Sequence, residues 1–116
     1  MDGTPSASIP ATMPDLQLFA SVADQMMNAT RVEVDGKAFA VRRTSAQRLR
    51  TVTFTVDGHE YRAIEQNPEK PSRWGQLARD GHRVVQFIDT TTRKFVAVAV
   101  DDTVKTYGAL TRKSQR

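Results

Sequence analysis

The chain of 116 residues contains no cysteine. This absence excludes disulfides, thiolate metal sites and cysteine nucleophiles. Histidine is scarce: only His59 and His82 are present, and neither stands in an HExxH pattern or in a His/Cys cluster, so the sequence does not predict a structural zinc site. No run of about 18 apolar residues is present that could form a membrane-spanning helix.

Signatures of common enzyme classes are also missing, since the chain has neither a Walker A loop nor a GxGxxG segment. Pro14-Asp15 followed by Asp35-Gly36-Lys37 formally matches the PD…(D/E)xK nuclease pattern. That chemistry needs two carboxylates around one cation, whereas Asp15 is expected to open a helix and Asp35-Gly36 to form a hairpin turn. We therefore expect a chain that is not an enzyme, with no catalytic residue, no metal and no cofactor.

Charge is unevenly distributed along the chain. Residues 1–30 hold three aspartates and no Lys or Arg, whereas residues 31–116 hold all 17 Lys and Arg against the other 10 acids, a net charge of +7. Such a division favours an anionic partner, or docking of the first segment on the second. The simpler interpretation is that excess charge keeps a small domain soluble.

The N-terminal third of the sequence predicts a tail and a helix. Residues 1–13 are small and polar with two prolines, which predicts a disordered tail without the features of a secretory signal, and we expect a cytoplasmic protein. Residues 14–29 predict a helix with one apolar stripe. We expect this stripe to dock on the chain's own domain. The alternative is a protein partner bound through Leu16, Phe19, Ala23 and Met27.

From residue 31 the apolar residues alternate with polar ones, which is typical of strands. The clearest example is RTVTFTV (50–56), with Val52, Phe54 and Val56 on one face. Asp35-Gly36 and Asp57-Gly58 predict two-residue hairpin turns, and Asp101-Asp102 predicts a third tight turn. The expected strands cover 31–34, 38–41, 50–56, 60–65, 82–88, 94–100 and 103–107.

A second helix is expected within SRWGQLARDG (72–81), after the proline-braced segment 66–71. Ser72 is a suitable N-cap, and Gly81 suits the position after the helix. Trp74 and Leu77 share a face, which favours a plug that closes one end of a barrel, with a recognition element as the alternative. The strands 82–88 and 94–100 are apolar on both faces, so both faces should be covered.

These elements predict a mainly β (α+β) fold. We expect an antiparallel meander of about seven strands curled into a small roll or barrel, with an N-terminal helix and a short helix between strands four and five. The domain should span residues 14–109, followed by a basic frayed tail at 110–116. The strand count is similar to that of small SH3-like or OB-like barrels, a resemblance that implies no function by itself.

The segment RRTSAQRLR (42–50) predicts the binding function. It holds four arginines and no acid, and the guanidinium fork matches phosphate oxygens. We therefore expect a non-catalytic module that contacts single-stranded nucleic acid, with Tyr61, Trp74 or Tyr107 as stacking platforms. The alternatives are a merely solvated loop, or a protein-interaction module that uses the N-terminal helix or an edge strand. The expected nucleic-acid-binding residues are Arg42, Arg43, Arg48, Arg50, Arg83, Arg93 and Lys94.

Overall fold

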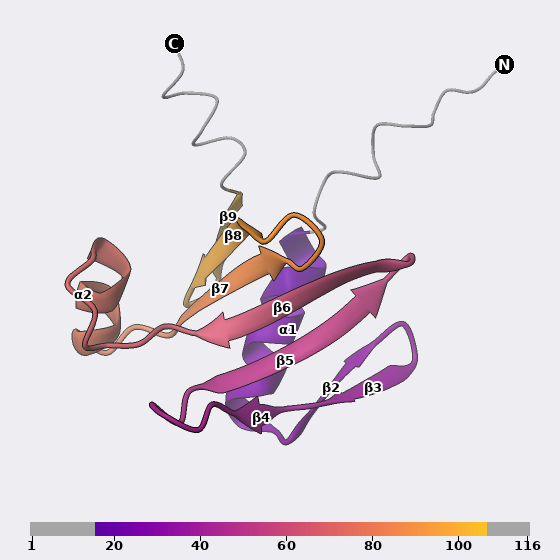
Figure 1. Ribbon diagram of the computed structural model, residues 1–116, viewed down its shortest axis with the longest axis horizontal. Coiled ribbons are helices and arrows are strands. Elements are labelled where there is room, and N and C mark those ends of the chain that lie inside the picture. Colours follow the sequence, from indigo (N-terminus) through magenta and orange to yellow (C-terminus); the bar gives the residue numbers. More distant parts are fainter. Residues whose placement is uncertain (1–15, 107–116) are drawn as a thin grey trace, which may run out of the picture.

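A computed structural model of the protein describes residues 16–106, so the expected tails at 1–13 and 110–116 lie outside the described residues. Figure 1 shows the arrangement. Two helices and eight strands follow in the order α1 (Leu16–Asn28), β2 (Arg31–Val34), β3 (Lys37–Ala40), β4 (Arg42–Arg43), β5 (Arg50–Val56), β6 (His59–Glu65), α2 (Arg73–Arg79), β7 (Val84–Asp89), β8 (Lys94–Val100) and β9 (Thr103–Thr106).

The strands form antiparallel sheets, as predicted, and local turns connect most of them. β2 and β3 make a two-stranded sheet, while β4 to β9 make a six-stranded meander in chain order. Asp35-Gly36 and Asp57-Gly58 have positive φ at both residues, as the type I′ turn requires. Turn chemistry in the sequence is therefore sufficient to define these two hairpins.

The predicted barrel is wrong, because the sheets are not closed. Helix α1 contacts β2 and β5 as well as β8 and β9, so it packs across the meander and buries the apolar face of the sheet. Figure 1 shows α1 crossing behind the meander. We call the sheet face that contacts α1 the inner face and the opposite one the outer face. The apolar face of a strand can be buried by a helix as well as by another part of the sheet.

The strand count and the place of the second helix also differ from the prediction. Arg42 and Arg43, expected in a loop, form the short edge strand β4 against Arg50 and Thr51. There are thus eight strands among the described residues rather than seven, and α2 follows the fifth strand instead of the fourth. Two residues give too short an alternation to be recognised in a sequence.

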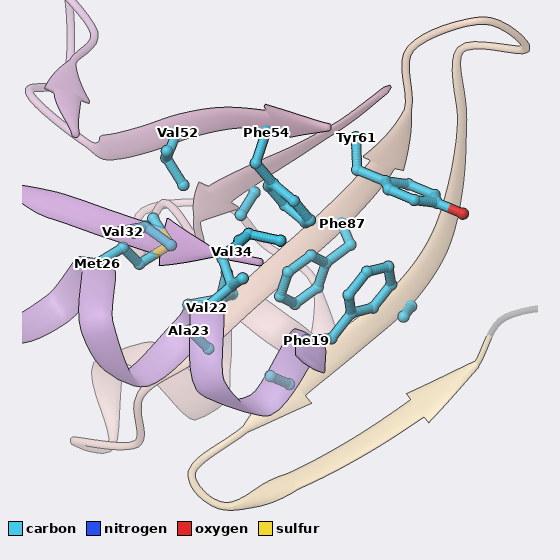
Figure 2. Packing of buried hydrophobic residues seen from close by; sticks show 14 residues of the cluster. Phe19, Val22, Ala23, Met26, Val32, Val34, Val52, Phe54, Tyr61 and Phe87 are labelled. Atoms are coloured by element: carbon cyan, nitrogen blue, oxygen red, sulfur yellow. The ribbon is translucent and has the colours of Figure 1, made fainter. Parts of the chain in front are cut away.

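The core lies between α1 and the inner face (Figure 2). Phe19, Val22, Ala23 and Met26 of α1 have no exposed surface, so the helix docks on its own domain, as expected. The Phe19 ring stacks on Phe87 with ring centres 4.3 Å apart and meets Phe54 edge-on at 6.0 Å. An aromatic cluster therefore joins the helix to strands β5 and β7.

Helix α2 does not plug the core, contrary to the expectation. Trp74 and Leu77 are only half-buried and lie outside the core cluster, and Gly75 is the one buried residue of α2. A Cβ at Gly75 would overlap the carbonyl of Lys70, which explains glycine at this close contact between the helix and the preceding loop. The predicted N-cap is confirmed, since the Ser72 hydroxyl accepts a hydrogen bond from the Gly75 N–H at 3.1 Å. Figure 1 shows α2 lying beside the meander instead of beneath it.

Candidate nucleic-acid interface

Strand register determines which side chains share the outer face. Arg42 pairs with Thr51, and Thr51 pairs with Ile64; this row continues through Gln86 and Val98 to Lys105 on β9. A neighbouring row contains Thr53, Arg62, Ile88 and Phe95. Because directly paired residues point to the same side of a sheet, both rows lie on the outer face. This face therefore carries basic, hydroxyl and apolar side chains.

One end of the outer face is hollowed into a groove, which we call the Arg42–Arg62 groove. Its volume is about 590 Å³, and it lies between β3 and the outer face of β4, β5 and β6. Both arginines are exposed, and neither forms a salt bridge with any residue in the described range 16–106. The lining is Ala38, Phe39, Ala40, Arg42, Thr44, Thr51, Thr53, Arg62 and Ile64.

Threonines hold the basic side chains and the adjoining loop in place. The Arg62 Nε–H donates to the Thr53 hydroxyl at 3.2 Å. Thr44 anchors the loop 44–49, because its N–H donates to the Leu49 carbonyl at 2.9 Å and its hydroxyl accepts from the Leu49 N–H at 3.1 Å. Arg48 adopts a positive φ in this loop, where its carbonyl accepts a hydrogen bond from Arg43 Nη1. Arg42, Arg43 and Arg48 thus lie close together.

Arg50 belongs to the inner side of the sheet. Its side chain lies on the same side of β5 as those of Val52 and Phe54, because successive side chains of a strand alternate between the two faces. The Arg50 guanidinium lies 3.3 Å from the Glu65 carboxylate, next to the Met27 sulfur of α1. Arg83 is also engaged by acids, since it contacts Asp24 of α1 at 3.1 Å and Asp102 at 3.7 Å, and donates to the Asp101 carbonyl. Arg50 and Arg83 therefore form ion pairs on the helix side of the sheet and do not line the groove.

Arg93 and Lys94 lie at the turn between β7 and β8 and do not line the groove. Lys94 pairs with Asp89, a buried residue next to Ile88 of the row that contains Arg62. Arg93 and Lys94 are both exposed, and Arg93 has a positive φ. The predicted binding residues thus divide into Arg42 in the groove with Arg43 and Arg48 next to it, a helix-side pair, and a pair at the β7–β8 turn.

The expected stacking platforms lie in three different environments. Tyr61 is buried in the core with 6% exposure, Trp74 is half-buried beside β8 and β9, and Tyr107 lies outside the described residues. Phe95, which sequence reasoning missed, is 45% exposed on the outer face. The doubly apolar sequence of β8 hid it, because a bulge between Phe95 and Ala97 changes which face the strand presents.

Arg62 was also missed by sequence reasoning, although a signal was present. It stands alone among the basic residues of its segment, so a search for arginine clusters passes over it. The alternation of β6 does place it, since Tyr61 and Ala63 are buried and Arg62 must point the other way. Only the register with β5 brings it beside Thr53 and into the groove with Arg42.

The residues expected to contact a protein partner are mostly occupied by the chain itself. Phe19 and Ala23 have no exposed surface, and Met27 packs against the core. Leu16 is 40% exposed at the start of the helix. The apolar stripe of α1 is therefore used within the domain.

A polar cluster borders the core at the other end of the sheet. His59 Nε2 lies 2.8 Å from Asp89 Oδ2, and the rings of His59 and Tyr61 are 4.8 Å apart. Burial raises the pKa of Asp89, but the hydrogen bond with His59 and those from the N–H groups of Thr91 and Thr92 outweigh it, so the pKa lies below its ordinary value. Burial, followed by the nearby Asp89 charge, raises the pKa of Tyr61.

Replacing Asp89→Asn is expected to destabilise the fold at neutral pH and to have little effect in acid. A carboxylate whose pKa is lowered by folding stabilises the native state above its unfolded pKa, near 3.8, and this contribution is lost as the pH falls through the lower folded value. Urea unfolding of both proteins between pH 7 and pH 2, about the range of carboxyl titration, measures the difference. Asp57→Asn at an exposed type I′ turn is the matched control and should change stability little at any pH. A constant difference across the range would contradict the assignment.

No group of three or more His, Cys, Asp or Glu in the described range 16–106 is arranged to hold a metal ion. Neither helix in this range has the length and apolar character needed to cross a membrane. Comparison with protein-family models, curated proteins and solved structures finds no match for the chain.

Proposed function

We propose that this protein is a non-catalytic binding module that contacts single-stranded nucleic acid on the outer face of its sheet. The observation that carries the proposal is the Arg42–Arg62 groove, in which two exposed guanidinium groups lie among threonine hydroxyls. Arginine and threonine are common donors to phosphate oxygens in nucleic-acid complexes. Arg43, which pairs with Arg50 and so has the opposite orientation to Arg42, and Arg48 add positive charge at the same edge of the sheet without lining the groove.

The distribution of acids supports this choice of face. Glu65, Asp89 and Asp24 are engaged on the helix side, by Arg50, His59 and Arg83 respectively. On the outer face of the strands, Arg42, Arg62 and Lys105 share the surface with Glu60, which accepts a hydrogen bond from the Thr90 hydroxyl at 2.7 Å, and with Asp101 and Asp102 at the turn before β9. The lining of the Arg42–Arg62 groove contains no acid, so its cations attract a polyanion without being offset by carboxylates there.

The apolar residues of the same face support a single strand over a duplex. Ile64, Ile88 and Phe95 are partly exposed between the cations. Single strands bind to basic surfaces with exposed aromatic side chains, because their unpaired bases stack on them. A duplex presents mainly phosphates to such a face and leaves these residues without a role.

The double variant Arg42→Ala/Arg62→Ala is expected to lower the affinity for a labelled 12-nucleotide oligothymidylate by about 100-fold or more, because hydrogen bonds to charged groups contribute about 1.5–3 kcal/mol each. The log–log salt slope should become shallower by about 1.4, which corresponds to two phosphate contacts on a single strand. Fluorescence anisotropy over a salt series measures both quantities.

The matched control is Arg93→Ala/Lys94→Ala, which removes the same charge at the turn between β7 and β8, outside the lining of the groove. It should change the affinity much less than the groove variant. Equal losses would show that net charge, and not the groove, governs binding. No binding by the wild-type protein at about 50 mM salt would reject the proposed function.

A further inference from the structure

A second groove lies at the other side of the outer face. Its volume is about 460 Å³, and it is formed by α2 together with β8 and β9. Trp74 and Leu77 of α2 supply one wall, and Val98 and Val100 of β8 supply the floor. We call it the Trp74 groove. It is more apolar than the Arg42–Arg62 groove and has an aromatic ring in its wall.

The two grooves lie on one continuous face. Val98 and Lys105, which line the Trp74 groove, belong to the same cross-strand row as Arg42 and Thr51. Five inter-strand steps of about 4.8 Å place Arg42 and Lys105 about 24 Å apart along the sheet. A stacked strand rises about 3.4 Å per nucleotide, so about seven nucleotides extend from one groove to the other.

The charges around the Trp74 groove favour an anionic occupant. Arg73 and Lys105 are exposed, and neither forms a salt bridge within residues 16–106. The Arg73 guanidinium lies over the Trp74 ring, 5.2 Å from its centre, so this ring already carries a cation on one face.

The two acids of this groove are already engaged. Asp101 accepts from the Arg83 N–H at 3.0 Å, and its other oxygen lies 2.8 Å from His82 Nδ1. Asp102 lies 3.7 Å from the Arg83 guanidinium. Their negative charge is therefore partly offset, and the cations of the groove remain available to phosphates.

We propose that the Trp74 groove is a base-stacking subsite of the same nucleic-acid site, in which an unpaired base packs against the exposed part of Trp74 while Arg73 and Lys105 contact the flanking phosphates. This inference rests on the proposed function. It adds recognition of the base, which the Arg42–Arg62 groove does not provide. Indole rings are suitable for this role because every base has a π-face.

The test uses the intrinsic fluorescence of Trp74, the only tryptophan in the chain. Titrating the full-length protein with a 12-nucleotide oligothymidylate should quench this emission with the same midpoint as anisotropy binding. An abasic sugar–phosphate strand of equal length should bind more weakly and leave the emission unchanged. This comparison separates base stacking from phosphate contact without any substitution in the protein.

Variants at Trp74 give an independent measurement. Trp74→Leu keeps an apolar side chain but no ring, and it should weaken oligothymidylate binding by about 5- to 150-fold, the range measured when a stacking side chain is removed. Trp74→Phe should restore most of the affinity. Both variants should give the same weak binding to the abasic strand.

Each outcome has a distinct meaning. Saturable binding with no change in Trp74 emission, or equal losses for the Leu and Phe variants, would overturn this inference and leave the proposed function standing. No binding of oligothymidylate at about 50 mM salt would overturn both. An emission change that follows protein concentration without nucleic acid would show that a second copy of the chain occupies the groove, and would also overturn the inference.

Discussion

A chain that begins at Arg31 will show no cooperative thermal transition. Helix α1 supplies Phe19, Val22, Ala23 and Met26 to the core, and all four are fully buried. Full burial of each of the three larger side chains contributes about 1.5–3 kcal/mol, hence about 5–9 kcal/mol together. This approaches the whole stability of a small domain, about 5–15 kcal/mol. Far-ultraviolet circular dichroism during heating measures the transition.

The control for this truncation removes only residues 1–13, the predicted tail, and should leave the melting temperature unchanged. The acidic charge of residues 1–30 would shield basic surface only if the helix lay over that surface. The structure places α1 on the inner face, opposite the Arg42–Arg62 groove, so the helix and the groove do not compete. A truncated chain that stays folded as a monomer would show that the sheet is stable without its helix.

Phe54→Ala will lower the free energy of unfolding by about 3–5 kcal/mol, the range for removing a fully buried phenylalanine. Phe54 has no exposed surface and meets Phe19 and Phe87 edge-on, with ring centres 6.0 and 6.4 Å away. Its removal leaves a cavity between the helix and two strands, which the rigid aromatic neighbours cannot fill. Urea denaturation with a two-state fit measures the loss.

Thr53→Ala is the adjacent control on the outer face and should cost less than about 1 kcal/mol. The substitution removes a partly exposed hydroxyl and its hydrogen bond with Arg62. Similar losses at positions 53 and 54 would mean that the buried face of β5 is assigned wrongly. The comparison of the variants at positions 53 and 54 also bears on the proposed function, because Thr53 lines the Arg42–Arg62 groove.

The local elements of this fold follow from the sequence by itself. Alternation in residues 50–56 correctly placed Val52 and Phe54 on the buried face. The apolar stripe predicted α1, and the Asp-Gly pairs defined the β2–β3 and β5–β6 hairpins with their registers. These features depend on residues close in the chain, where side-chain periodicity and backbone preference act directly. The grouping of Arg42, Arg43 and Arg48 is similarly local.

Only the tertiary structure decided how these elements close and which cations share a surface. Strand periodicity is the same whether the apolar face meets a helix or the far side of a barrel, so it could not reveal that α1 keeps the sheets open. Arg83 is 59 residues from Asp24 along the chain, and their pairing arises from docking of α1 against the sheet. Arg42 and Arg62 meet through two successive strand registers. Such contacts depend on the folded backbone, because no preference of a single segment encodes its partner in another.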